Sequence, residues 1–182
     1  MRRSDLEHLI RAAGRIAGER ELVIIGSQAV LGQFPDAPIA LLFSMEVDLY
    51  PLRRPDLAEK VDGAIGEGSA FHQTHGYYAQ GVGPDTATLP AGWQRRLVRI
   101  ENDNTGGFAG LCLEVHDLAI SKYVAGREKD REFTRELARH GMTDRQTLLK
   151  ELAATKLDPA LARIVKGRIA RDFPRHKRAQ RR

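Results

Sequence analysis

Two short motifs on neighbouring predicted strands constrain the fold of this chain more than any other feature. Gly26-Ser27 directly follows the apolar run 21–25 and precedes a helix-prone segment, 27–33. Glu46-Val47-Asp48 lies in the next strand-like segment, 45–49. Because side chains of a strand alternate between its two faces, Glu46 and Asp48 should point the same way while Val47 points into the core. The fold must therefore place two like charges on one face, next to a glycine turn.

The chemistry of these residues indicates phosphate transfer. Two carboxylates on one face repel each other unless a cation lies between them, and Mg²⁺ completes its shell with water and substrate phosphates. One or two such ions can hold a nucleoside triphosphate for in-line attack by a hydroxyl. A glycine at a helix start lets the backbone approach a phosphate. Each motif alone is usually only a turn or a solvated face, but their order favours the phosphate interpretation.

The pattern along the rest of the chain predicts a mixed α/β part followed by helices. A helix should begin at Ser4, with Ser4 and Glu7 as a capping box, and end near Gly18. Several consecutive strands favour antiparallel pairing. Asp117 is predicted to cap the first of the later helices. The remaining predicted strands are 76–82, 95–101 and 108–115, and the remaining predicted helices are 54–65, 118–125, 128–140 and two more that begin near residues 143 and 158.

Composition excludes several classes of protein. With 42% hydrophobic and 29% charged residues among 182, the chain should form a folded domain. Its longest apolar run, 38–43, is too short to span a bilayer, so we expect a cytoplasmic protein with no membrane partner. The single Cys112 leaves no internal disulfide and no Cys-based zinc site. His72 and His75 lie in a predicted Gly-rich loop, where a metal site is not favoured.

The positive charge is concentrated at one end of the chain. Residues 161–182 contain nine Lys/Arg and one acid, whereas residues 1–160 contain 20 bases and 23 acids. Such a basic segment attracts polyanions, most simply nucleic acid, although a solubilising tail has the same composition.

At these motifs the sequence resembles the nucleotidyltransferase superfamily, which has a polymerase-β-like core. More narrowly, it is similar to the AbiEii-type or MenT-type nucleotidyltransferase toxins of bacterial toxin–antitoxin systems. The resemblance covers roughly residues 22–142 and includes Gly26-Ser27 and the segment 44–48. Two blocks, 116–122 and 125–130, are similar to the family's helical segment, in which a lysine and a later basic–acidic pair reach the active site.

The resemblance implies a fold, a reaction and roles for single residues. The fold would be α/β (α+β), a nucleotidyltransferase-type mixed sheet flanked by helices. The reaction would be Mg²⁺-dependent transfer of a nucleoside monophosphate from an NTP to a hydroxyl, with the 3′ end of tRNA as acceptor and a cognate antitoxin as partner. The implied metal ligands are Glu46 and Asp48; the other catalytic residues are Lys122 and Asp130; the nucleotide-binding residues are Gly26, Ser27, Ser44, Lys122 and Arg127. In some relatives the hydroxyl at the position of Ser44 is phosphorylated, which silences the enzyme.

The same resemblance divides the chain. Residues 1–116 would form the core, residues 117–173 a helical portion that completes the site, and residues 174–182 a basic tail.

The sequence departs from the family pattern in ways that leave alternatives open. The first acid is Glu46, where Asp is commoner, and eighteen residues separate Ser27 from it. A third metal carboxylate is not evident, with Glu101 and Glu114 as candidates from later strands. One alternative is therefore a catalytically silent module that binds nucleotide, RNA or a protein. Another keeps the enzyme but makes the acceptor a protein hydroxyl or a small molecule such as an aminoglycoside.

Overall fold

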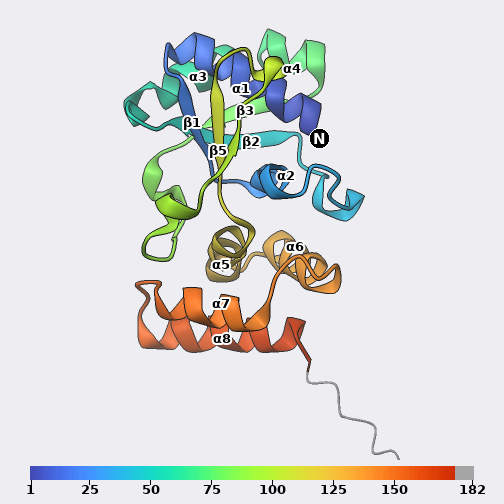
Figure 1. The fold of residues 1–182 in the computed structure, drawn as a ribbon, viewed down its shortest axis with the longest axis vertical. Helices are drawn as coiled ribbons and strands as arrows, with labels where there is room; N and C mark the ends of the chain where they lie inside the picture. Colours follow the sequence, from blue (N-terminus) through green and yellow to red (C-terminus); the bar gives the residue numbers. More distant parts are fainter. Residues whose placement is uncertain (175–182) are drawn as a thin grey trace, which may run out of the picture.

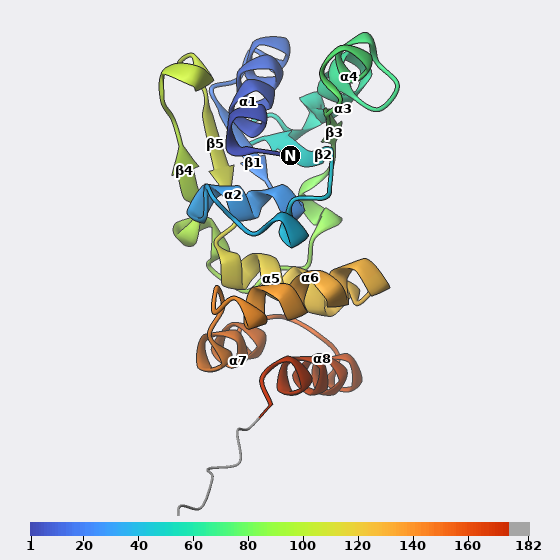
Figure 2. The same cartoon turned by 90° about the vertical axis from the view of Figure 1, so that its right-hand side faces the viewer.

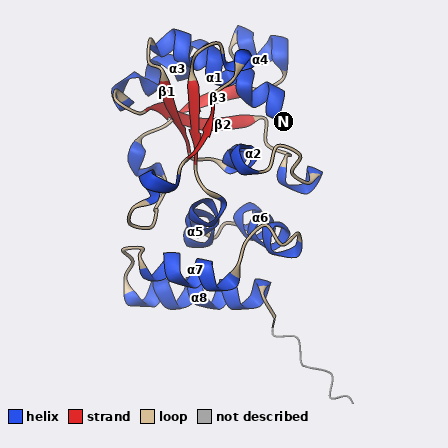
Figure 3. Ribbon diagram, viewed as in Figure 1, coloured by secondary structure: helices blue, strands red, loops and turns tan. Residues whose placement is uncertain are grey.

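A mixed five-stranded sheet forms the centre of the first two thirds of the chain in the computed structural model, which describes residues 1–174 (Figures 1 and 3). The strand order is β3-β2-β1-β5-β4. β1 pairs antiparallel with β2, and β4 with β5, whereas β1–β5 and β2–β3 are parallel. The strands are β1 (Glu21–Ile24), β2 (Glu46–Pro51), β3 (Tyr78–Gly81), β4 (Val98–Ile100) and β5 (Ala109–Cys112).

The expected fold class is confirmed, but the expectation of antiparallel pairs holds for only two of the four pairings. The reason lies in the connections. Parallel neighbours need a long crossover, and a crossover containing two helices joins β2 to β3. The sequence pattern showed the strands but did not show which ones become neighbours.

Helices cover the sheet and then form a separate layer. α1, α3 and α4 lie on one side of the molecule, and α5 and α6 lie at the opposite end of the strands, with α7 and α8 as a further pair beyond them (Figures 1 and 2). The helices are α1 (Arg3–Ala17), α2 (Val30–Gln33), α3 (Ala58–Ile65), α4 (Ala70–His75), α5 (Val115–Ala125), α6 (Glu128–Arg139), α7 (Arg145–Ala153) and α8 (Pro159–Asp172). Short 3₁₀ turns are η1 (Ser27–Ala29), η2 (Ile39–Leu41), η3 (Pro55–Leu57), η4 (Pro84–Thr86), η5 (Trp93–Arg96) and η6 (Asp103–Thr105).

None of the helices in residues 1–174 is long and apolar enough to cross a membrane. The predicted basic tail, 174–182, lies outside the described residues except for its first residue. The division between residues 116 and 117 stays a prediction, although α5 does begin close to it, at Val115.

The hydrophobic core forms where the apolar stripe of α1 meets the sheet. Leu6, Leu9 and Ile10 of α1 are fully buried, as are the β1 residues Leu22 and Ile24. Burial of each such side chain contributes about 1.5–3 kcal/mol relative to exposure. This packing fixes β1 at the middle of the sheet.

Two predicted helix caps are wrong. α1 begins at Arg3, where the Asp5 carboxylate accepts a hydrogen bond of 2.8 Å from the Arg2 amide, so Ser4 and Glu7 form no capping box. Glu7 instead accepts hydrogen bonds from Asn102 and Asn104 in the distant η6 turn. Long-range partners therefore replaced the local one that the sequence pattern suggested.

The second wrong cap is at α5, and a further local error concerns α4. Glu114 caps α5, because its carboxylate accepts a hydrogen bond of 2.8 Å from the His116 amide. Asp117 is instead fully buried in the first turn. His72 and His75 lie on α4 and not in a loop. α5 therefore begins earlier than the strongest local signal indicated, whereas α4 was not predicted as a helix.

The strand directions bring several elements to one edge of the sheet. β1 and β5 are parallel and end at the same edge, where β2 begins because it runs antiparallel to β1. Ile25, just after β1, donates from its amide to the Asp48 carbonyl over 3.1 Å. α5 starts three residues after β5 ends. The Gly26 turn, the start of β2 and the start of the helical layer therefore meet at this edge.

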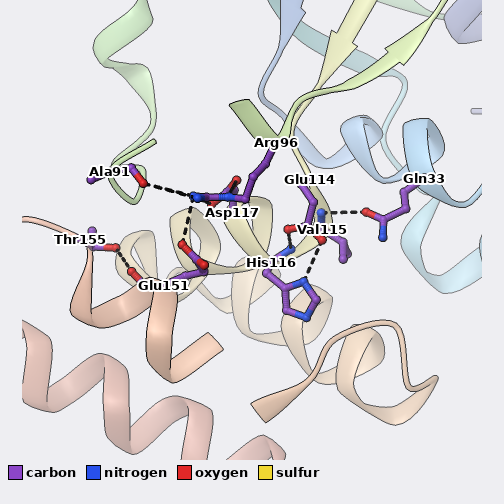
Figure 4. A network of polar contacts seen from close by, with 9 residues as sticks. All are labelled: Gln33, Ala91, Arg96, Glu114, Val115, His116, Asp117, Glu151 and Thr155. Carbon is purple, nitrogen blue, oxygen red and sulfur yellow. Dashed lines mark hydrogen bonds and ion pairs between the residues drawn. The ribbon is translucent and has the colours of Figure 1, made fainter. Parts of the chain in front are cut away.

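An ionic clamp between the partly exposed Arg96 and two buried acids joins the sheet part to the helical layer (Figure 4). Arg96 of η5 donates from Nη2 to Asp117 Oδ1 over 2.6 Å and lies 3.1 Å from Glu151 Oε2 of α7. Asp117 is fully buried, and the Glu151 side chain is 7% exposed. Loss of the arginine would leave two buried carboxylates without a counter-charge, which destabilises a protein strongly.

We therefore predict that Arg96→Ala lowers the free energy of unfolding by about 2–4 kcal/mol, because both acids would be left unpaired. The matched control is Arg99→Ala, since Arg99 forms exposed ion pairs with Glu21 and Glu101 that should contribute less than about 1 kcal/mol. Urea unfolding of both variants checks the prediction. Equal losses in the two variants would contradict it.

Candidate active site

Glu46 and Asp48 lie together at the edge of the sheet described above. Val47 between them is fully buried, while both carboxylates line the same cavity, as the alternation of the strand predicts. The Asp48 carboxylate lies so close to Gly26 that a Cβ on Gly26 would overlap it. Glycine is therefore required in the turn after β1 because of Asp48, and not because of its backbone, since the φ of Gly26 is −79°.

The two carboxylates disfavour each other's charge. Burial, followed by a hydrogen bond to the Glu46 carboxyl and the negative charge of Glu46, raises the pKa of Asp48 to about 7. The positive charges of Lys122 and Lys129 act in the opposite direction but do not compensate. The two lysines leave the pair only partly compensated, and a divalent ion between the carboxylates would supply further positive charge.

Neighbouring residues fix the orientation of Glu46. Tyr78, opposite it on β3, donates from its hydroxyl to Glu46 Oε2 over 3.0 Å. The Glu46 amide donates to Ser44 Oγ over 3.1 Å, so the Ser44 hydroxyl holds the backbone at the start of β2. Tyr78 was not identified from the sequence, since only the register of β2 and β3 shows that it lies beside Glu46.

Cationic side chains face the carboxylates from α5 and α6. Gly126 ends α5 with a φ of +64°, and the reversal it permits brings the start of α6 back to Lys122. Asp130 is 1% exposed, and its carboxylate lies 3.5 Å from Lys122 Nζ and 2.8 Å from Arg127 Nε. Burial alone would raise the pKa of Asp130, but the hydrogen bond from Arg127 and the charge of Lys122 hold it below its usual value. Asp130 therefore remains ionised and orients both cations.

Two cavities meet at the carboxylates. The larger, of about 750 Å³, lies between β2, the segment before it and α6, and it contains Glu46 and Ser44. The smaller, of about 240 Å³, lies between the Gly26 turn, α5 and the loop after β3. The residues that line both cavities are Asp48, Thr86, Lys122 and Arg127. The residues predicted to bind metal or nucleotide, and Asp130, thus each line one of two adjacent cavities.

The candidates for a third metal carboxylate are wrong. Glu101 is paired with Arg99, and Glu114 caps α5 and contacts His116, so neither lines the larger or the smaller cavity. The residue next to Asp48 on β3 is Gln80, an amide that lines the larger cavity. Within residues 1–174 no group of three or more His, Cys, Asp or Glu is placed to hold a metal. Any ion here would need water and substrate oxygens to complete its shell.

The raised pKa of Asp48 predicts a pH-dependent stability in metal-free buffer. Between the ordinary pKa near 4 and the folded value of about 7, only the folded state keeps the proton, so stability falls as the pH rises through this range. Asp48→Asn removes this effect, because an amide cannot ionise. We expect the variant to exceed the wild type by about 2 kcal/mol at pH 8 and by almost nothing at pH 4.

Urea unfolding at the two pH values, with a chelator present, measures this difference. Asp36→Asn in an exposed loop is the matched control and should change little at either pH. A difference between wild type and Asp48→Asn that does not depend on pH would contradict the assigned environment.

Comparison with known proteins agrees with this architecture. No curated protein and no solved structure matched the chain. A family described as a nucleotidyltransferase of unknown function (DUF6036) matches residues 4–176, which include the sheet, the two cavities and all four C-terminal helices. The chain belongs to this nucleotidyltransferase family.

Proposed function

We propose that this protein is a Mg²⁺-dependent nucleotidyltransferase that moves a nucleoside monophosphate from an NTP to a hydroxyl and releases pyrophosphate. One observation carries the proposal: Glu46 and Asp48 share a cavity with Lys122, although β2 and α5 are far apart in the sequence. Carboxylates for a divalent ion and a cation for phosphate oxygens are the groups that phosphoryl chemistry requires.

The carboxylate pair fits Mg²⁺. The two groups line the same cavity, and the charges of Lys122 and Lys129 do not offset the rise in the pKa of Asp48. Glu46 and Asp48 would hold the ion, whose positive charge would offset the negative charge that develops on the phosphates. Tyr78 would keep one Glu46 oxygen engaged and so hold the other toward the ion. The number of ions, one or two, stays part of the proposal.

In this proposal the phosphates lie at the junction of the two cavities. Gly26 lines the smaller cavity and Ser27 the larger one, so the turn borders both sides of Asp48. Lys122 and Arg127 face the same junction, held by Asp130. The acceptor oxygen would attack the α-phosphorus while the bond to the β-phosphate oxygen breaks, so the entering and leaving groups need space on opposite sides. Two cavities that meet at Asp48 provide that space.

Asp130 and Ser44 then act as positioning residues. Asp130 is buried behind Lys122 and Arg127, and so orients these cations instead of receiving the acceptor proton. The Ser44 hydroxyl is bonded to the main chain of Glu46 and lines the larger cavity, which makes it accessible to a nucleotide. Phosphorylation of this hydroxyl would add negative charge beside Glu46 and Asp48 and would disfavour a bound triphosphate.

For the acceptor we propose an RNA, specifically the 3′ end of tRNA, and for the biological role a toxin restrained by a cognate antitoxin. The resemblance of residues 22–142 to the AbiEii-type and MenT-type toxins supports both, and the net charge of +5 favours a polyanionic partner.

A silent binding module is the second candidate. It is favoured by Gln80, which gives the carboxylate pair a neutral neighbour instead of a third acid. Such a module would bind nucleotide at the same junction without turnover.

The direct test incubates the protein with total tRNA, Mg²⁺ and each α-labelled NTP in turn, beside Asp48→Asn. We expect label on RNA with the wild type and a loss of about 100-fold or more in the variant, because a carboxylate proposed to hold Mg²⁺ is removed. Nucleotide binding without any labelled product would favour the silent module.

Tyr78→Phe tests the metal assignment within the enzyme. Loss of a group that orients a metal ligand typically weakens metal affinity by about 10–100-fold. We expect the Mg²⁺ concentration for half-maximal transfer to rise about tenfold, with near-normal rates at saturating Mg²⁺. Tyr77→Phe is the control, since its hydroxyl bonds His8 Nδ1 and not the site. An unchanged Mg²⁺ requirement in Tyr78→Phe would contradict the proposal that Tyr78 orients Glu46 as a metal ligand.

A further inference from the structure

Three exposed hydrophobic side chains lie in one short segment next to the larger cavity. Ile39, Phe43 and Met45 are 78%, 79% and 54% exposed, and we call them the apolar strip. Large apolar side chains that gather on a surface mark interaction sites more often than isolated ones do. None of these three residues has a role in the proposed reaction.

The strip is held in place by its neighbours. Leu41, between Ile39 and Phe43, is 2% exposed, and η2 packs against α6. On the other side of Phe43, the Ser44 hydroxyl accepts from the Glu46 amide and fixes the entry to β2. The backbone therefore presents Ile39 and Phe43 outward on an anchored segment, so little ordering is needed when a partner binds.

The occupant of the strip must be larger than the cavity. Phe43 lines the larger cavity, but Ile39 and Met45 do not. A nucleotide with its phosphates at the junction of the two cavities would leave Ile39 and Met45 in water. Only a molecule that extends from the cavity over its rim would cover all three.

The charges at the same rim favour a polyanion. Lys129 and Arg135 of α6 are exposed, line the larger cavity and form no ion pair within residues 1–174. The acids beside them are mostly engaged, Asp130 with Lys122 and Arg127, and Glu136 with Arg139 and His140. Glu132 is the exception. Lys129 and Arg135 against Glu132 leave a net charge of +1 at this rim, apart from the Glu46 and Asp48 carboxylates that line the same cavity.

We propose that the apolar strip, with Lys129 and Arg135, binds the unpaired terminal nucleotides of a single-stranded nucleic acid. This inference rests on the proposed function and makes the acceptor a nucleic acid end rather than a small molecule or a protein side chain. A base stacks on Phe43, the preceding base packs on Ile39 or Met45, and the two cations contact phosphates. Stacking on an aromatic ring tolerates any base, so this surface binds strand ends without reading their sequence.

The test measures binding of a single-stranded RNA of about 12 nucleotides by fluorescence anisotropy, with Mg²⁺ and without NTP. Phe43→Ala should weaken binding about tenfold or more, and Phe43→Trp should restore it. Ile164→Ala is the matched control, because Ile164 is 52% exposed on α8 and lies outside both cavities. It should change the affinity by less than about twofold.

The salt dependence tests the cations separately. Arg135→Gln should reduce the slope of log affinity against log salt concentration by about 0.7, as expected for one lost phosphate contact on a single strand. NTP affinity should be unchanged in Phe43→Ala.

Two results would overturn the inference. One is RNA binding that Phe43→Ala leaves intact, which would mean that the strip serves another partner, such as a protein. The other is an equal loss of NTP affinity in that variant, which would mean that Phe43 holds the donor base. If RNA binding depends on Phe43 but no NTP is ever transferred, the surface stands and the proposed reaction fails. If the wild type labels RNA and Phe43→Ala binds RNA normally, the reaction stands and this surface fails.

Discussion

The repulsion between the Glu46 and Asp48 carboxylates is the constraint on which the rest of the site depends. Burial and the neighbouring acid raise the pKa of Asp48 to about 7, so the folded chain holds a pair of groups that a divalent cation would stabilise. The surrounding residues follow from this. Gly26 has no side chain because Asp48 occupies that space, and Tyr78 and Ser44 hold Glu46 in place.

The site needs the helical layer as much as the sheet. β2 supplies the carboxylates, but Lys122 and Arg127 come from α5 and the turn into α6, which Gly126 permits. The same α5 helix carries Asp117, which pairs with Arg96. Through Arg96 the clamp ties α7 and the loop after β3 to this helix. We therefore propose that residues 117–173 complete the active site, in agreement with the family match across both parts.

The sequence predicted those features that depend on local order. Strand alternation placed Glu46 and Asp48 on one face with Val47 buried, and the Gly26-Ser27 motif was found at the turn beside them. Features that depend on contacts between distant segments were missed or wrong. Tyr78 becomes a partner of Glu46 only through the parallel register of β2 and β3. Asp117 was interpreted as a cap because local sequence does not reveal its partner Arg96, 21 residues earlier. Glu114 was only a candidate metal ligand, and it is the cap.

The same distinction explains the apolar strip. A sequence window around residues 38–43 shows only an apolar run, and such a run is normally buried. The structure shows that Leu41 is buried while Ile39 and Phe43 are not, at the rim of the cavity that holds the carboxylates.

The measurement that tests the central claim most directly is anomalous diffraction from crystals grown with Mn²⁺ and a non-hydrolysable NTP analogue. The account predicts an anomalous peak in contact with Glu46 and Asp48, with the triphosphate beside Lys122. A peak at other residues, or a bound nucleotide away from this junction with no metal at the carboxylates, would contradict the assignment of the active site.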